Sequence, residues 1–367
     1  MKTLLLFLSV FLSASLFGQY TQIPDPNFEQ RLITLGYDSG TPDGIVLTAD
    51  IIDIYDLNVN GLNINDLTGI EDFIGLQILS CGLNNLTSLD LSQNTALLEL
   101  SCSENQLTSL DLSNNPLLVR LLCEYNQLTS LDLTHNPDLW GNLRLHDNQL
   151  TSIDLGEVSG NSLEIDIYLQ NNQLTSIDLS QCSYLNELYI SNNNLTSLDI
   201  SNNPQLSDLI CDNNEITNLD LTNNAWLQQL RVSNNLLTNL NLSNLIQLEA
   251  VFCSSNQLTC LNVNNLNNGD MYGIDALNNP DLYCIKVDDA DWAQVNWSSY
   301  VDPQASFSED CGDDCSSSTV IINELSTSKN LIQILDMMGR ETSFKPNTPL
   351  IYVYDDGSIE KVFRVEY

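Results

Sequence analysis

The strongest constraint on this chain is an internal repeat of about 21 residues. A string close to Asn-x-Leu-Thr-x-Leu-Asp-Leu occurs nine times, with spacings of 21, 21, 22, 24, 21, 21, 21 and 21 residues. Its first residues are Asn84, Asn105, Asn126, Asn148, Asn172, Asn193, Asn214, Asn235 and Asn256. A unit this short cannot bury its own apolar side chains, so neighbouring units must stack into a solenoid. Each repeat position then becomes a column along the stack.

The second repeat, residues 97–116, shows the expected local structure: L-x-x-L-x-C-x-x-N-x-L-T-x-L-D-L-S-x-N-P. So short a unit leaves little room for an outer helix, and we expect two short strands per turn, at residues 100–102 and 110–112. Rungs stacked about 4.8 Å apart would make the leucine columns the core. The Asn column is expected to bond backbone groups of its own rung and of the next rung.

Five cysteines form a column three residues before the repeated Asn: Cys81, Cys102, Cys123, Cys211 and Cys253. Other repeats place Leu, Ile or Val there, so the position is a buried apolar slot in which Cys acts as a small hydrophobic residue. Thiols in single file do not form a clustered metal site. Disulfides between neighbouring rungs would be strained, because parallel side chains do not converge. We therefore expect free, buried thiols here and at Cys182, which replaces a turn Asn.

The repeat resembles the leucine-rich repeat family, in particular its short class with 21-residue units that end in Leu-Asp-Leu. The resemblance covers residues 76–287 and implies a mainly β solenoid with a cap at each end. The N-terminal cap is expected at residues 19–75, with a helix at residues 24–33 followed by divergent first repeats at residues 51–73. Residues 288–315 resemble the C-terminal cap of secreted bacterial leucine-rich repeat proteins of the Bacteroidetes.

Four cysteines lie at or near this C-terminal cap, which allows three pairings. A bridge between Cys284 and Cys311, which flank the cap segment, is the first choice and agrees with an oxidising exterior. Cys260 and Cys315 are the remaining candidates, and their pairing stays open.

Both ends of the chain carry patterns typical of export. Residues 1–18 predict a secretory signal peptide, with Lys2 before an apolar run and small residues. No later stretch approaches the roughly 20 apolar residues of a spanning helix, so we expect no membrane span. Residues 316–367 predict a small all-β module with alternating strands, a turn at Gly339 and an Asp-Gly hairpin turn.

The strings Gly-Arg, Asn-Thr-Pro-Leu and Asp-Asp-Gly in this last module resemble the type A C-terminal sorting domain of the type IX secretion system. That resemblance implies the type IX secretion machinery as a partner, followed by release of the protein or its attachment to the surface. We therefore expect a secreted or outer cell-surface location. The alternative is a small β-rich extra cap.

Composition argues against two broad classes of function. The chain has 11 Lys and Arg against 48 Asp and Glu, a net charge of −37, whereas nucleic-acid binding needs clustered cations. Two His and few cations leave little material for acid–base catalysis, and no set of residues resembles a catalytic site. We therefore expect a non-enzymatic protein with no nucleic-acid partner.

One carboxylate per repeat forms a further column: Asp90, Asp111, Asp132, Asp154, Asp178, Asp199 and Asp220. Stacked carboxylates repel one another unless donors or cations screen them. We expect the neighbouring Thr and Ser/Asn columns to donate hydrogen bonds to these carboxylates. Loose binding of Ca²⁺ along this Asp column is the weaker hypothesis, and no other metal or cofactor is expected.

The exposed side of the first strand differs from the monotonous Ser, Thr, Asn and Asp columns, because its side chains vary and become large, aromatic or cationic. The outer strip, as we call it, comprises Arg120, Leu122, Tyr125, Arg144, His146, Tyr168, Tyr189, Ile210, Arg231 and Phe252. Aromatic and Arg side chains carry much of the energy of protein interfaces. The strip therefore predicts binding of a protein or glycan ligand in extracellular or cell-surface recognition or adhesion.

Two alternatives remain open. Residues with high β-propensity can simply fill a strand face, without binding anything. The chain as a whole would then be a structural or cation-responsive surface spacer without a specific ligand.

Overall fold

The computed structural model describes residues 19–158, 163–312, 315, 331–336, 340–342, 350–354 and 359–362. The expected signal peptide at residues 1–18 lies outside the described residues, as do Gly339 and the Asp-Gly turn at residues 356–357. The chain divides into two compact units, Met1–Ser317 and Ser318–Tyr367, which are described separately.

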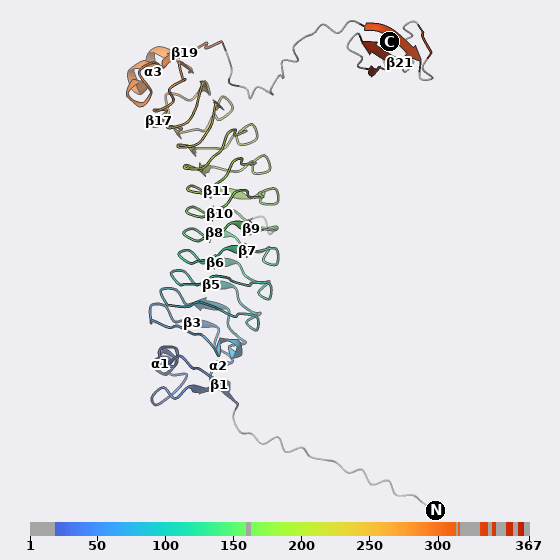
Figure 1. The fold of residues 1–367 in the computed structure, drawn as a ribbon. Coiled ribbons are helices and arrows are strands. Elements are labelled where there is room, and N and C mark those ends of the chain that lie inside the picture. The colour runs from blue at the N-terminus through green and yellow to red at the C-terminus, as the bar shows by residue number, and fades with distance from the viewer. Residues whose placement is uncertain are drawn as a thin grey trace, which may run out of the picture. The chain divides into compact units, whose positions relative to one another are not determined.

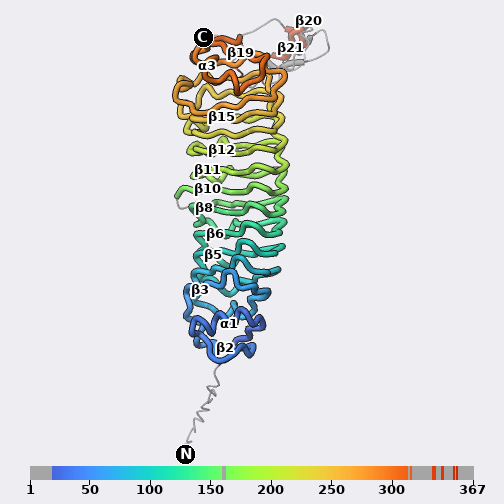
Figure 2. The backbone as a smooth tube through the Cα atoms, turned by 90° about the vertical axis from the view of Figure 1, so that its left-hand side faces the viewer, coloured from blue at the N-terminus to red at the C-terminus, as the bar shows by residue number. Residues whose placement is uncertain are grey.

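The first unit contains a stack of short parallel strands that runs along one side of its rungs (Figure 1). Among the described residues this sheet has eleven strands, and neighbours in the stack are consecutive rungs of the chain. The strands are β3 (Asp56–Asn58), β4 (Ile78–Ser80), β5 (Glu99–Ser101), β6 (Arg120–Leu122), β8 (Gly141–Arg144), β10 (Ile165–Tyr168), β11 (Leu185–Tyr189), β12 (Asp208–Ile210), β13 (Gln229–Arg231), β15 (Ala250–Phe252) and β17 (Gly273–Asp275). This is the mainly β repeat solenoid that the sequence predicts. Figure 2 views the unit from the side of this sheet.

The other side of the rungs is less regular than expected. Its strands pair only in places, as β7 (Ser130–Asp132) with β9 (Ser152–Asp154) and as the four-stranded sheet β14–β16–β18–β19. The bounds of that sheet are β14 (Asn239–Asn241), β16 (Cys260–Asn262), β18 (Cys284–Lys286) and β19 (Ser306–Ser308).

The expectation of two strands in the second repeat is therefore wrong. Residues 110–112 form no strand, and the first strand, β5, begins one residue earlier than expected. Leu110 and Leu112 are nevertheless buried, at 8% and 1% exposed. Apolar packing places these leucines without ladder hydrogen bonds, because burial constrains geometry less tightly than hydrogen bonding does.

The repeated Asn bonds two rungs together through its carboxamide. Asn126 Oδ1 accepts from the Leu107 amide at 3.0 Å, and its Nδ2 donates to the carbonyls of Cys102 at 3.0 Å and Cys123 at 3.2 Å. Leu107 and Cys102 belong to the preceding rung, so the expectation of bonds to the next rung is wrong in direction. The residue before it, Tyr125, has a φ of 54°, which turns the chain so that the carboxamide faces inward.

A second set of buried asparagines lies in the turn that leads into the strands. These residues are fully buried and comprise Asn94, Asn115, Asn136, Asn203 and Asn224. Asn115 Nδ2 donates to the carbonyls of Leu91 and Asn94, at 3.1 and 3.0 Å, and so bonds to the preceding rung as well. Cys182 takes the place of this Asn in one repeat and is buried and free.

The N-terminal cap covers the open end of the leucine core. It consists of β1 (Tyr20–Gln22), α1 (Pro26–Leu35), β2 (Ile45–Leu47), α2 (Thr48–Ile51) and η1 (Ile70–Asp72). Asp25 begins α1 by accepting from the amides of Asn27 and Phe28, and Gly36 ends it with a φ of 85°. Phe28 stacks on Phe73, with ring centroids 6.0 Å apart, so two aromatic rings close the core.

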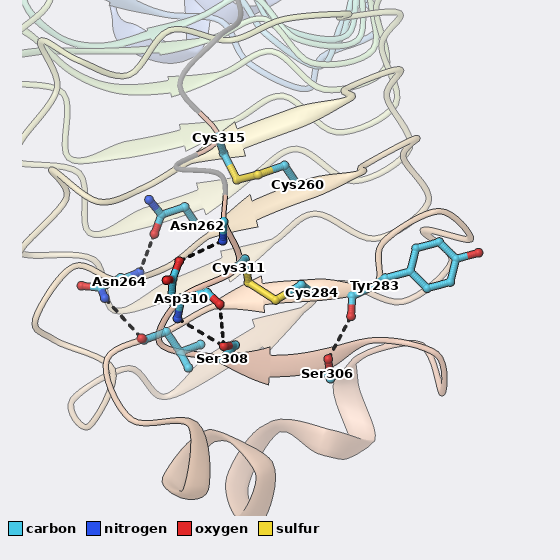
Figure 3. The surroundings of a disulfide bond; sticks show 12 residues. Cys260, Asn262, Asn264, Tyr283, Cys284, Ser306, Ser308, Asp310, Cys311 and Cys315 are labelled. Atoms are coloured by element: carbon cyan, nitrogen blue, oxygen red, sulfur yellow. Dashed lines mark hydrogen bonds between the residues drawn. A yellow bond between two sulfur atoms is a disulfide. The ribbon is translucent and has the colours of Figure 1, made fainter.

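The C-terminal cap consists of α3 (Ala290–Trp297), η2 (Ser298–Tyr300) and β19. The chain then crosses β18 and β16, where Cys311 bonds to Cys284 and Cys315 bonds to Cys260 (Figure 3). The pair ranked first from the sequence is thus bonded, and the open pairing is resolved as Cys260–Cys315. The thiols of the cysteine column are buried and free.

The second unit contains β20 (Leu331–Asp336), β21 (Leu350–Tyr354) and β22 (Ile359–Val362). β21 pairs antiparallel with both other strands, so the described residues form a three-stranded sheet.

Candidate recognition surface on the strand face

Most of the outer strip forms a register column on the eleven-stranded sheet. Each member pairs with its equivalent on the next strand, as Arg144 with Tyr168 and Tyr189 with Ile210. The column runs through Ser80, Ser101, Leu122, Arg144, Tyr168, Tyr189, Ile210, Arg231, Phe252 and Asp275. Side chains alternate along a strand, so the preceding residue of each strand, such as Leu143, is buried instead.

Two tyrosines form the centre of this column. The rings of Tyr168 and Tyr189 stack with centroids 4.7 Å apart and planes 14° from parallel. The Tyr168 hydroxyl donates to Glu187 Oε2 at 3.2 Å. Burial of the phenol, followed by repulsion from Glu187 and Asp166, raises the pKa of Tyr168 to about 12. The pair therefore presents a stacked aromatic surface, and burial raises the pKa of the Tyr189 hydroxyl as well.

A second outward-facing column lies two residues earlier in each strand, and Arg120 is its one member in the outer strip. Its central members, Asp166, Glu187 and Asp208, are register neighbours on β10, β11 and β12. Burial raises the pKa of Glu187, and repulsion from the other two carboxyls raises it further. Burial likewise raises the pKa of Asp208. The signal in the sequence was the strand alternation, which makes both flanking residues of a buried Leu outward-facing.

The three arginines of the strip have different surroundings. Arg231 bonds Asp212, Nε to Oδ2, at 3.3 Å, and its Cζ lies 4.8 Å from the centroid of the Phe252 ring. Arg120 lies 3.8 Å from a carboxylate oxygen of Glu99. Arg144 is exposed and forms no ion pair with any other described residue. Its guanidinium remains available to a ligand.

Tyr125 and His146 form a third pair at the edge of the strand face. Their rings meet edge to face, with centroids 5.2 Å apart, and His146 Nδ1 lies 2.8 Å from Asp147 Oδ2. The structure thus groups members of the strip into Tyr125–His146, Tyr168–Tyr189 and Arg231–Phe252.

The Asp column lies on the other side of the rungs, and each carboxylate bonds within its own turn. Asp132 Oδ1 accepts from the Thr134 amide at 2.9 Å and from the Thr134 hydroxyl at 2.7 Å. These bonds lower the pKa of Asp132. The donor is two residues further along the chain, not the neighbouring Thr column expected from the sequence. Asn241 makes the same backbone bond, to Ser243, so the turn needs an acceptor but no charge.

The described residues contain neither a metal-binding cluster nor a membrane-spanning helix. No group of three or more His, Cys, Asp or Glu is arranged to hold a metal ion in the part of the chain that is described. No helix within it has the length and apolar character that crossing a membrane requires.

Stacked parallel strands, leucine columns, a ladder of asparagines and a cap at each end define a leucine-rich repeat solenoid. The chain belongs to the leucine-rich repeat proteins. It is similar to the functional domain of InlJ from Listeria monocytogenes, at 30% sequence identity and a TM-score of 0.62. That match covers 79% of this chain and 70% of the InlJ domain, which includes a cysteine ladder.

Two further solved structures share the fold. YopM from Yersinia enterocolitica is 26% identical with a TM-score of 0.50, over 64% of this chain and 51% of that one. The LRIM1/APL1C complex matches at 20% identity and a TM-score of 0.50, over 71% of this chain and 57% of the matched chain. No family model matches the chain, and no curated protein sequence matches it.

Proposed function

We propose that this chain is an exported, non-enzymatic recognition protein whose strand face binds a protein or a glycan outside the cell. The stacked pair Tyr168–Tyr189 carries the proposal, because it combines aromatic area with a fixed geometry on an exposed sheet. A rigid aromatic pair loses little conformational entropy on binding, which makes it a good anchor for an interface.

A protein is the preferred ligand, because the strand face carries zones of opposite charge. Exposed Arg144 lies beside Tyr168, and the carboxyls of Asp166, Glu187 and Asp208 follow on the adjoining column. A partner whose surface carries the complementary charge pattern would bind more tightly, and the pattern would fix its position and orientation along the strand face.

The test is a capture experiment with the immobilised full chain and surface proteins and glycans from the cells or hosts that it meets. Wild type is compared with the double variant Tyr168→Ala/Tyr189→Ala. A specific ligand should bind the variant about tenfold more weakly or worse. The matched control is Tyr20→Ala/Tyr283→Ala, which removes two exposed tyrosines, 58% and 62% exposed, that lie outside the eleven-stranded sheet. Equal capture by wild type and the strip variant contradicts the proposal.

For the second unit we propose a sorting role in type IX secretion, with the first unit as its cargo. Three antiparallel strands are compatible with such a domain. In a bacterium that has this machinery, removal of residues 318–367 should leave the protein in the periplasm, whereas the full chain reaches the medium or the surface. Export of the shortened chain at the normal level would instead favour the extra-cap alternative.

A further inference from the structure

A hollow of about 540 Å³ lies where the strand face meets the C-terminal cap. β15 and β17 form one part of its wall, and α3 and η2 form the other. Asp275 contributes a carboxylate to the lining, and aromatic side chains make up much of the rest, namely Phe252, Tyr272, Trp292, Trp297 and Tyr300. Tyr272 and Tyr300 are 66% and 51% exposed, so a ligand can reach their rings.

The hollow exists because side chains become small at the end of one strand column. This column holds Glu187, Asp208 and Gln229, and then Ala250 and Gly273. Gly273 does not have the left-handed backbone that would require glycine, and a Cβ there would lie 3.6 Å from Phe252 Cζ. The backbone therefore tolerates a side chain at this position, and its absence leaves the edge of the Phe252 ring uncovered.

The chemistry of the lining favours a cation. Aromatic faces attract ammonium and guanidinium groups, and the attraction grows as the cation loses water. Among the residues that the structure describes, Asp275 is the only charged one that lines the hollow. The chain already shows the interaction nearby, since the Arg231 guanidinium lies over the Phe252 ring. A net charge of −37 adds a long-range attraction for cations.

We propose that this hollow binds an arginine or lysine side chain of the protein partner. The inference rests on the proposed function, because the hollow continues the outer strip from Phe252 to the cap. The guanidinium or ammonium group contacts the rings of Tyr272 and Trp292 and the carboxylate of Asp275, and the rest of the partner extends along the strip.

The test needs no identified partner, because single amino-acid derivatives serve as probes. N-acetyl-arginine amide is titrated into the full chain labelled with ¹⁵N-tryptophan, and the indole N–H signal of Trp292 is followed by NMR. N-acetyl-citrulline amide has nearly the same shape without the charge. We expect a saturable shift with arginine and binding of citrulline that is weaker by about fivefold, the effect of roughly 1 kcal/mol of cation attraction.

Variants locate the probe in the hollow. Tyr272→Ala should weaken arginine binding by about two- to fivefold. Asp275→Asn should weaken it by about fivefold while retaining an acceptor for the Leu277 amide, which Asp275 binds at 3.1 Å. Tyr283→Ala is the matched control, because Tyr283 is 62% exposed and does not line the hollow. It should leave the titration unchanged.

Three outcomes would overturn the inference: equal binding of citrulline and arginine, no saturable shift of the Trp292 signal, or tighter binding of methyl N-acetylglucosaminide than of arginine. The last result would assign the hollow to a glycan. Failure here is distinguishable from failure of the proposed function, because Tyr168→Ala/Tyr189→Ala tests the strip by capture and leaves the hollow intact.

Discussion

The repeated Asn of each rung adds side-chain hydrogen bonds to the backbone bonds that join neighbouring repeats. Asn suits this position because one side chain both accepts from a backbone amide and donates to backbone carbonyls. Asp is nearly the same size but offers no donor, so its charge would face the carbonyl oxygens of two rungs. The residues on either side of each Asn can vary, because the backbone supplies the partners.

Asn126→Ala should lower the free energy of unfolding by about 2 kcal/mol, because it leaves the Leu107 amide and buried carbonyls without a partner. Asn126→Asp should cost at least as much, because the donors are lost and a charge is buried. Urea unfolding followed by circular dichroism measures both. The control Asn114→Ala removes an exposed Asn whose Nδ2 donates to Ser113 Oγ, at 3.3 Å, and should stay within about 0.5 kcal/mol of wild type.

The Asp column predicts a particular response to acid. Hydrogen bonds from the residue two positions on lower the pKa values of the following carboxyls: Asp90, Asp111, Asp132, Asp178, Asp199 and Asp220. Groups with a lowered folded-state pKa stabilise the fold above their unfolded pKa, about 3.9 for Asp. That stability is lost as the pH falls through the lower folded-state value.

We therefore expect the melting temperature to fall steeply below about pH 4. Replacing Asp111, Asp132 and Asp178 by Asn should keep the turns at pH 7, since Asn241 makes the same bond. The melting temperature of this triple variant should fall less steeply below about pH 4 than that of wild type. Thermal melts between pH 2 and 7 measure the effect. If the melting temperatures of the triple variant and of wild type fall equally below about pH 4, these carboxyls do not control the loss of stability in acid.

At the scale of elements, the two ends of the solenoid are closed by different means. The N-terminal cap relies on packing and on an N-capped helix, in which Glu29 is buried and accepts from the amides of Asp43 and Gly44. The C-terminal cap is tied back to the strands by two disulfides. Covalent closure suits a short segment that cannot bury a core of its own.

Removing the Cys284–Cys311 bridge, by the double change to Ser, should destabilise the C-terminal rungs most. The bridge spans 27 residues, and the loss of loop-closure entropy in the unfolded state predicts that such a bridge stabilises the fold by about 3 to 4 kcal/mol. Hydrogen exchange should speed up in β16, β18 and β19 and remain unchanged in β4–β6. A uniform change along the whole stack would contradict the nearest-neighbour coupling expected of a solenoid.

At the scale of the whole molecule, the net charge of −37 acts on a fold with little cationic surface to offset it. Repulsion among carboxylates opposes compactness and is screened by salt. Local hydrogen bonds hold the Asp side chains but do not remove their mutual repulsion.

Raising NaCl at pH 7 should therefore raise the melting temperature, and CaCl₂ at the same ionic strength should give no larger rise. Differential scanning fluorimetry with NaCl, MgCl₂ and CaCl₂ at matched ionic strength makes the comparison. A larger stabilisation by CaCl₂, reversed by a chelator, would favour the cation-responsive spacer over the simple screening effect.

The repeat period by itself determined the solenoid, its leucine core and its asparagine ladder, because a unit of about 21 residues can bury its apolar side chains only against neighbouring units. The same period places most of the outer strip in register, and so Tyr168 beside Tyr189. Periodicity also marks Cys81, Cys102 and Cys123 as core positions, where they are buried and free.

Only the tertiary structure decided which groups meet where the repeat is broken. The Cys260–Cys315 pairing and the hollow beside Gly273 both lie at the C-terminal cap, where residues far apart in sequence come together. The stacking of Tyr168 on Tyr189 and of Arg231 on Phe252 depends on side-chain rotamers, which a repeat pattern does not specify. A periodic sequence constrains the position of the backbone in each rung, whereas side-chain orientation and the caps depend on non-repeating contacts.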